Sequence, residues 1–144
     1  MLNRFYDDLL AAFGPQHWWP VSWAPETAPW EIAAGAVLTQ NTNWNNVERA
    51  LHRLYEAGCT TAGDLLRLTD TELAERIRPA GYFNVKAKRL KALAQWWQDN
   101  VAAAAEPTTS LADLRRDLLA VHGVGPETAD SILLYAFNRP SFVI

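Results

Sequence analysis

The chain has 144 residues, which is enough for one domain that buries most of its apolar surface on folding. Hydrophobic residues make up 49% and charged residues 20%, proportions that are typical of a soluble globular protein. The single cysteine, Cys59, excludes a disulfide framework and a four-cysteine metal or iron–sulfur site within the chain. No segment has the pattern of a signal peptide or a membrane span, so we expect a cytoplasmic protein with no membrane partner.

The net charge of −3 hides an uneven distribution of charged side chains. Residues 1–75 carry four basic and ten acidic side chains, whereas residues 76–144 carry nine basic and six acidic ones. The interval from Arg76 to Lys91 contains six basic residues and no acidic one. Because association with phosphate groups depends on the local field, the acidic average does not exclude a nucleic-acid partner.

The first half of the chain predicts helices separated by one long loop. Residues 2–13 carry apolar side chains at helical spacing and precede a Gly-Pro stop. A loop rich in proline and tryptophan, residues 15–29, leads to the almost uncharged run Trp30–Gln40, which is typical of a buried helix. Asn43 or Asn45 is expected to cap the next helix, which ends at a glycine.

The second half of the chain continues with short helices and tight turns. Five more helices are expected, over residues 60–68, 70–79, 84–100, 111–119 and 126–138. Thr69 and Glu72 form a capping box. Ser110 is expected to cap a later helix, and Pro126 fits the first position of the last one. The alanine-rich stretch 102–105 is expected to be a surface connection.

These elements predict an all-α fold, a helical bundle of one domain without repeats or strands. We divide the chain into an N-terminal helix with its loop, residues 1–27, and a helical core, residues 28–144. In the expected helix over residues 84–100, Val85 and Leu90 are predicted to face the core, and the lysines are predicted to face solvent.

The most informative segment is Leu118–Asp130, in which two apolar helices are joined by Gly123, Val124 and Gly125. The two glycines permit positive φ and close approach of another backbone, and Val124 is expected to anchor the bend in the core. Pro126 is tolerated in the first helical turn, where N–H groups lack intrahelical partners. The remaining free N–H groups are expected to face outward and to bind a phosphate oxygen without reading base sequence. The alternative is a plain helical corner whose glycines only make the bend.

Several segments resemble the endonuclease III superfamily of DNA glycosylases, also called HhH-GPD proteins. Gly123–Asp130, followed by Phe142–Ile144, resembles the family's helix-hairpin-helix motif and its approach strand. Leu38–Thr42 is similar to the end of the family's first core helix, and Ile77–Leu90 resembles its glycine turn and basic helix. The resemblance runs from about residue 28 to the C-terminus and is closest to the 3-methyladenine glycosylase branch. It implies a monomeric helical protein that binds duplex DNA and flips one damaged nucleotide into a pocket.

The resemblance also implies which residues contact DNA. They lie in the hairpin, after the first core helix and on the basic helix: Gly123, Val124, Gly125, Glu127, Thr128, Gln40, Asn41, Lys86 and Lys88. Gln40 matches the position that fills the vacated base stack, and its alternative role is a solvent-facing residue that closes a helix. The two lysines are alternatively part of a solvated helix face.

The same resemblance suggests a base pocket and a cation site. Trp44, and Trp18 or Trp19 of the proline-rich loop, are placed near the flipped base, where an aromatic ring stacks on an electron-poor alkylated purine. Their alternative role is packing of the core or of the loop. The backbone carbonyls of Leu119, Val121 and Val124 match positions that hold a monovalent cation in such hairpins, although any hairpin presents carbonyls.

Two departures from the family limit the expected chemistry. Glu127 stands where strand-cleaving members have a lysine that forms a Schiff base with the sugar, which a carboxylate cannot do. Glu127 therefore resembles monofunctional members that hydrolyse the glycosidic bond with water, and its alternative role is to stabilise the helix dipole. The family's essential aspartate follows the segment that matches Phe142–Ile144, one position beyond the last residue. Asp130, which is expected to face solvent, is a poor substitute.

We therefore expect no catalytic residue within this chain and an absent or impaired release of bases. The resemblance implies a chain truncated before the catalytic aspartate and before the C-terminal part that carries a [4Fe–4S] cluster in many relatives. The expected function is recognition of damaged, alkylated bases in duplex DNA during base-excision repair. The alternatives are a non-catalytic helix-hairpin-helix DNA-binding module and a truncated gene product.

Overall fold

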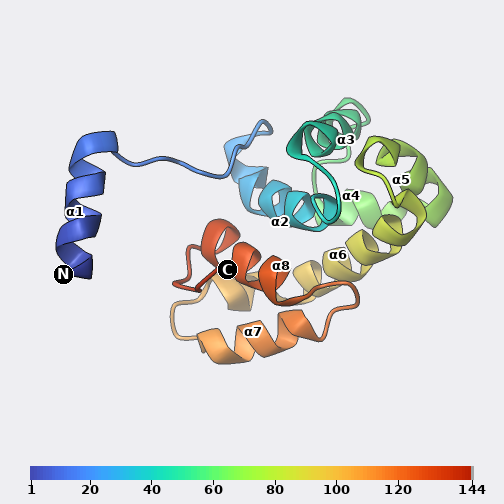
Figure 1. Cartoon of the computed structure of the whole chain (residues 1–144). Helices are drawn as coiled ribbons and strands as arrows, with labels where there is room; N and C mark the ends of the chain where they lie inside the picture. The colour runs from blue at the N-terminus through green and yellow to red at the C-terminus, as the bar shows by residue number, and fades with distance from the viewer. Residues whose placement is uncertain (144) are drawn as a thin grey trace.

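The structure is a computed structural model that describes residues 1–143, and all regular elements in this range are helical (Figure 1). The α-helices are α1 (Leu2–Phe13), α2 (Ala28–Leu38), α3 (Trp44–Glu56), α4 (Ala62–Arg67), α5 (Asp70–Arg76), α6 (Phe83–Ala105), α7 (Leu111–Leu119) and α8 (Pro126–Ser131). Two 3-10 turns, η1 (Pro25–Thr27) and η2 (Arg78–Ala80), and a π-helical turn, η3 (Ile132–Ala136), complete the set. The predicted all-α fold is confirmed.

Helix α2 forms the centre of the fold. Every residue from Trp30 to Leu38 is buried, as the uncharged run predicted. Helices α3, α6 and α8 and the turn η3 all pack against it. Because neighbours cover α2 on all sides, its sequence lacks the one-sided apolar stripe of a surface helix.

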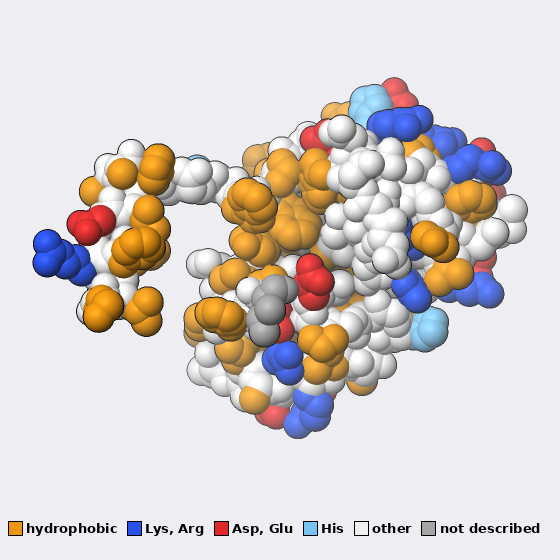
Figure 2. All heavy atoms as spheres, viewed as in Figure 1, with side chains coloured by type: hydrophobic (Ala, Val, Ile, Leu, Met, Phe, Trp, Pro, Cys, Tyr) orange, Lys and Arg blue, Asp and Glu red, His pale blue; other side chains and the backbone are white. Residues whose placement is uncertain are grey.

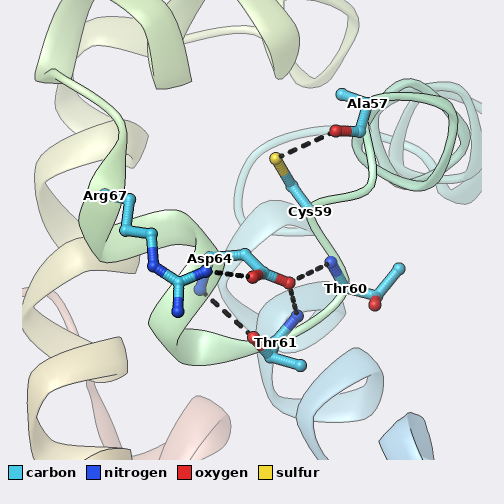
Figure 3. A network of polar contacts seen from close by, with 6 residues as sticks. All are labelled: Ala57, Cys59, Thr60, Thr61, Asp64 and Arg67. Atoms are coloured by element: carbon cyan, nitrogen blue, oxygen red, sulfur yellow. Dashed lines mark hydrogen bonds and ion pairs between the residues drawn. The ribbon is translucent and has the colours of Figure 1, made fainter.

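Helices α4 and α5 begin at capping boxes. The predicted pair Thr69 and Glu72 caps α5, and a second box that was not predicted, Thr61 with Asp64, caps α4. Asp64 accepts hydrogen bonds from the backbone N–H groups of Thr60 and Thr61 and pairs with Arg67 (Figure 3). These contacts satisfy N–H groups that have no partner inside the helix, so each short helix has a defined start.

Helix α6 differs from the predictions in where it ends and in which of its side chains face the core. It has 23 residues and continues to Ala105, so the alanine-rich stretch is its last turn and not a surface connection. Alanine is the strongest helix former, and Ala104 is fully buried. Leu90 is buried as predicted, but Val85 is 46% exposed. Although α6 is long, no helix within residues 1–143 is both long and apolar enough to cross a membrane.

Helix α1 stands apart from the rest of the structure (Figures 1 and 2). All of its residues from Leu2 to Phe13 are exposed, although its apolar side chains gather on one side. The loop after α1 returns to the core, where Trp23 is 7% exposed. The helix is where the sequence predicted it, and the division of the chain at residue 27 stays a prediction.

Candidate nucleic-acid interface and base cavity

The hairpin between α7 and α8 contains one glycine that the backbone requires. Gly123 has a φ of 86°, and a Cβ atom built on it would overlap the aliphatic carbons of Arg89. Gly125 has an extended backbone with a φ of −91° and open space around it, so only Gly123 uses the positive φ that both glycines permit. Val124 is 5% exposed and anchors the bend in the core, as predicted.

The hairpin leaves backbone donors available to a ligand. The N–H of Val124 donates to the carbonyl of Val121 over 3.1 Å. Within residues 1–143, the N–H groups of His122, Gly123 and Gly125 have no hydrogen-bond acceptor. His122 and Gly125 are exposed and Gly123 is half-buried. A phosphate oxygen at this bend would therefore find several unpaired donors close together.

Gln40 ties the hairpin to the end of α2. Its Nε2 donates to the carbonyl oxygen of Gly123 and to Oγ1 of Thr128, each over 3.0 Å. Its Oε1 accepts a hydrogen bond of 2.9 Å from Nη1 of Arg89 on α6. Gln40 is half-buried, so the structure does not support its alternative role as a solvent-facing residue. The next residue, Asn41, is exposed and has a φ of 54°.

The two candidate lysines of α6 lie in different environments. Lys88 is exposed, as predicted. Lys86 is 1% exposed, and its Nζ donates to the carbonyls of Leu38 and Ala80, each over 2.8 Å. Burial, followed by the charge of Arg89, lowers the pKa of Lys86. The interpretation of Lys86 as a DNA contact is therefore wrong, because its ammonium group holds the end of α2 inside the core.

Asp130 is also not where the sequence placed it. It is 7% exposed and forms an ion pair with Arg115, with 2.8 Å between Oδ1 and Nε. Ser141 donates a hydrogen bond of 2.7 Å to the same oxygen. The hydrogen bond from Arg115, the largest cause, and that from Ser141 lower the pKa of Asp130. Asp130 therefore fastens the segment after α8 to α7, and the expectation that it faces solvent is wrong.

A cavity of about 500 Å³ opens beside the hairpin. Its lining residues come from the N-terminal loop, the end of α2, the start of α3, helix α8, the turn η3 and the last described residue: Trp18, Trp19, Pro20, Thr39, Trp44, Glu127, Ser131, Tyr135 and Val143. The structure thus places Trp18, Trp19 and Trp44, the candidate pocket residues, in one cavity. Hydrophobic side chains gather on the side of the molecule that faces α1 (Figure 2).

Trp19, which the sequence named beside Trp18 as a candidate from the loop, is the centre of the aromatic wall. Its ring meets that of Trp44 edge to face at 5.5 Å and an interplanar angle of 85°. It also packs at 5.3 Å against Tyr135 in the π-helical turn. Gly35 of α2 makes room for both indoles, since a Cβ built on it would lie 3.3 Å from Trp44 and 3.6 Å from Trp19.

Glu31 fixes the loop that carries these tryptophans. It is the one charged residue of the central helix, and it is 1% exposed. Its Oε1 accepts hydrogen bonds from the N–H and hydroxyl of Ser22 over 2.7 and 2.9 Å, and its Oε2 accepts one from the N–H of Trp23 over 2.9 Å. A charged residue inside an otherwise apolar run was the available sequence signal for this role.

A second cavity of about 230 Å³ adjoins the first. It is lined by Trp19, Ala36, Thr39, Gln40, Asn41, Glu127, Thr128 and Ser131. Glu127 contributes to both cavities and is exposed, and it is the one charged residue that lines either of them within the described part of the chain. The pair of cavities therefore combines aromatic faces with a single negative charge at the start of α8.

The last described residues and the hairpin carbonyls leave two predictions open. Phe142 and Val143 have no regular secondary structure, and Ile144 of the predicted approach strand lies outside the described residues. The carbonyl of Val121 already accepts the bond from Val124 and keeps one lone pair. The proposed cation site at Leu119, Val121 and Val124 stays a prediction.

Comparison with known proteins identifies the family. The model of the HhH-GPD superfamily base excision DNA repair protein matches residues 34–141. A DNA repair glycosylase homologue from Methanocaldococcus jannaschii is 44% identical over all of this chain and 64% of its own length. The chain therefore belongs to the HhH-GPD superfamily of base excision DNA repair proteins, as the resemblance implied, and it spans less than two thirds of this relative.

Solved structures share the same fold. The H. pylori 3-methyladenine DNA glycosylase MagIII, bound to 1,N6-ethenoadenine, is 30% identical with a TM-score of 0.76, over 99% of this chain and 66% of that chain. A trapped endonuclease III–DNA covalent intermediate is 22% identical with a TM-score of 0.72, over 99% and 62% of the two chains. At 22% identity, this second likeness concerns the fold alone.

Proposed function

We propose that this chain recognises damaged bases in duplex DNA and provides the recognition part of a monofunctional N-glycosylase for alkylated purines. The observation that carries the proposal is the position of the aromatic cavity directly beside the hairpin, with Glu127 belonging to both. A duplex held by the hairpin would present a flipped nucleotide to Trp18, Trp19 and Trp44.

The hairpin is proposed to hold one phosphate of the duplex. The unpaired amides of His122, Gly123 and Gly125 donate to its oxygens, and Lys88 and Asn41 are exposed. Contacts of this kind position the duplex without reading its sequence. Selectivity for damaged bases therefore has to come from the cavity and from the lower free-energy cost of unstacking a damaged base.

The cavity is proposed to prefer a positively charged base. A purine alkylated at N3 or N7 and still attached to its sugar carries a positive charge, which indole faces attract. Glu127, the one charged lining residue within the described part of the chain, adds a Coulomb attraction. A neutral purine stacks on the same rings without the electrostatic contribution.

Calorimetric titration of free bases tests the cavity without DNA. The probes are 7,9-dimethylguaninium and its neutral partner 9-methylguanine. The first is a cation only while its N1–H is protonated, so the titration is run at mildly acidic pH. We expect the cation to bind about tenfold more tightly, and Trp44→Ala to weaken both. Glu127→Gln should reduce the preference to about threefold, since this carboxylate is exposed and its field is screened. Equal affinity for the two probes would contradict the preference for charge, and no binding of either would contradict the cavity.

Duplex binding separately tests the proposed contact between the hairpin and a phosphate of the duplex. Fluorescence anisotropy with an undamaged duplex and with one containing an abasic-site analogue should show affinity that falls with salt, by about 0.9 log unit per log unit of salt for each phosphate contact. We expect tighter binding to the abasic duplex, because its gap removes the cost of unstacking. A chain that binds neither duplex in low salt would rule out DNA as the partner.

The contacts of Asp130 favour a second candidate function, that of a DNA-binding module that releases no base. The other carboxylate of α8, that of Asp130, is held by Arg115 and Ser141 and does not line either cavity. Single-turnover incubation with a duplex containing 3-methyladenine separates the candidates. Base release that Glu127→Gln abolishes would favour the enzyme, and binding without release would favour the module.

We propose three further properties. A monovalent cation at the carbonyls of Leu119, Val121 and Val124 supports the hairpin, so replacing K⁺ by Li⁺ at constant ionic strength should weaken duplex binding about twofold. This chain binds DNA without an iron–sulfur cluster, because its single cysteine cannot ligate one. It acts as a monomer in the cytoplasm, in keeping with the free, buried thiol of Cys59.

A further inference from the structure

The tryptophan-rich loop before α2, residues 17–23, is fastened to the core by one side chain. Within residues 1–143, all hydrogen bonds of this loop go to the carboxylate of Glu31 on α2. The N–H and hydroxyl of Ser22 donate to Oε1 over 2.7 and 2.9 Å, and the N–H of Trp23 donates to Oε2 over 2.9 Å. Because the loop has no helix or strand of its own, and hydrogen bonds to a carboxylate are strong, this one group fixes where the loop backbone lies.

The indole rings around the loop are not held by hydrogen bonds of their own. The Nε1 atoms of Trp19, Trp23 and Trp44 are buried and have no acceptor among residues 1–143. Trp19 and Trp44 meet edge to face at 5.5 Å, and packing between rings accepts a range of offsets and tilts. The position of the aromatic wall therefore depends on the backbone that carries Trp19.

Helix α2 presents the anchor and the floor of the cavity on one face. Glu31, Gly35 and Thr39 are spaced by four residues, so they follow one another along the same side of the helix. Glu31 accepts the hydrogen bonds of the loop, and Thr39 lines both base cavities. Between them, Gly35 leaves room for the rings of Trp19 and Trp44. A small cavity of about 100 Å³ beside Glu31 also shares Trp44 with the larger base cavity.

We propose that Glu31 is a positioning residue that sets the aromatic wall of the base cavity in the free chain, before DNA binds. Glu31 lines neither base cavity, so its effect reaches a base through the loop backbone and not through contact. A displaced wall would stack less well on any purine, charged or neutral. The inference rests on the proposed function, since it concerns the affinity of that same cavity.

The test is calorimetric titration of Glu31→Gln with 7,9-dimethylguaninium and 9-methylguanine. Glutamine has the same size, but its amide nitrogen donates and cannot accept, so at least one hydrogen bond of the loop is lost. We expect the affinities for both probes to fall by the same factor, about fivefold. A loss confined to the cation would mean that the charge of Glu31 attracts the base, and it would overturn the positioning role.

Glu48→Gln is the matched control. It removes an exposed carboxylate that lines the same small cavity as Glu31. The affinity for the neutral probe should stay the same, and that for the cation should change by less than about twofold, because solvent screens this charge. A loss of the neutral probe as large as in Glu31→Gln would count against a specific anchor.

The affinity for an undamaged duplex separates a local role from a general one. In Glu31→Gln it should stay within about twofold of the unchanged chain, because the hairpin amides that are proposed to bind phosphate lie between α7 and α8. If duplex affinity fell by the same factor as the affinity for the two bases, Glu31 would act on the fold as a whole and the proposal would fail.

Ser22→Ala keeps the proposal testable if Glu31→Gln does not fold. Ser22 is exposed, and the change removes only its hydroxyl donor to Glu31. We expect both probes to bind about twofold more weakly. If neither probe binds the unchanged chain, the proposed function and the inference are both wrong. If both probes bind, and substitution of Ser22 or Glu31 leaves their affinities unchanged, the positioning role alone is wrong.

Discussion

The lobe formed by α3, α4 and α5 and the site formed by α2, α6 and the hairpin are held by different kinds of polar contact. In the lobe, the side-chain hydrogen bonds are local. Asp64 bonds to backbone N–H groups three and four positions away (Figure 3), and Arg78, in the adjoining turn η2, donates to Glu75. At the site, Gln40 and Lys86 bond to carbonyls 83 and 48 residues away. The local contacts are mostly exposed to solvent, and the distant ones are wholly or partly buried.

This difference has consequences for stability and for function. A local contact defines where a helix starts, and water replaces it when it is lost. A buried contact between distant elements sets how those elements are placed, and its loss leaves unpaired polar groups inside the protein. Substitutions at the site should therefore be more damaging than equivalent ones in the lobe.

The largest effect is expected for Lys86→Ala. The change removes buried methylene groups and leaves the carbonyls of Leu38 and Ala80 without their ammonium donor. We expect the free energy of unfolding to fall by about 2–3 kcal/mol, measured by urea denaturation. Lys88→Ala, on the same helix but exposed, should change it by less than about 0.5 kcal/mol. Similar losses for both lysines would remove the distinction between buried and exposed positions.

A smaller loss is expected for Gly123→Ala. The new side chain would adopt an unfavourable positive φ and displace Arg89, so we expect a loss of about 2 kcal/mol and weaker duplex binding. Gly125→Ala is the matched control, because its backbone is extended and the space around it is open. Its stability should be unchanged within about 0.5 kcal/mol. If Gly125→Ala nevertheless weakens duplex binding, the reason is contact with DNA and not folding.

Asp130→Asn is expected to cost about 1 kcal/mol at neutral pH, since Arg115 is partly exposed and solvent screens the pair. The fold lowers the pKa of this carboxyl, so its stabilisation is complete above the ordinary aspartate pKa. It is lost as the pH falls through the folded-state pKa. Denaturation curves of the two proteins should therefore differ at pH 7 and converge in acid. A constant difference at all pH values would contradict the ion-pair explanation.

The smallest loss of stability is expected for a substitution in the lobe. Thr69→Ala removes the N-cap of α5, and we expect a loss of roughly 0.5–1 kcal/mol, with duplex affinity unchanged. Thr69→Ser keeps the hydroxyl acceptor and should restore most of the stability. A loss larger than that of Lys86→Ala would reverse the comparison between the two regions.

The sequence by itself determined the helices and much of the motif. Capping residues such as Thr69 and Ser110 act within one turn, so their spacing alone predicts where α5 and α7 begin. The bend around Gly123 with its buried Val124 was predictable for the same reason. Trp18 and Trp44 were assigned to one pocket through the family resemblance, and the structure brings them together.

The tertiary structure decided which polar side chains are buried and what they hold. Lys86, Asp130 and Glu31 have charges that suggest solvent, yet each is at most 7% exposed and bonds to groups outside its own helix. Trp19 and Tyr135 share a cavity although 116 residues separate them in the sequence. No local periodicity encodes such pairings, since they depend on how whole helices pack around α2.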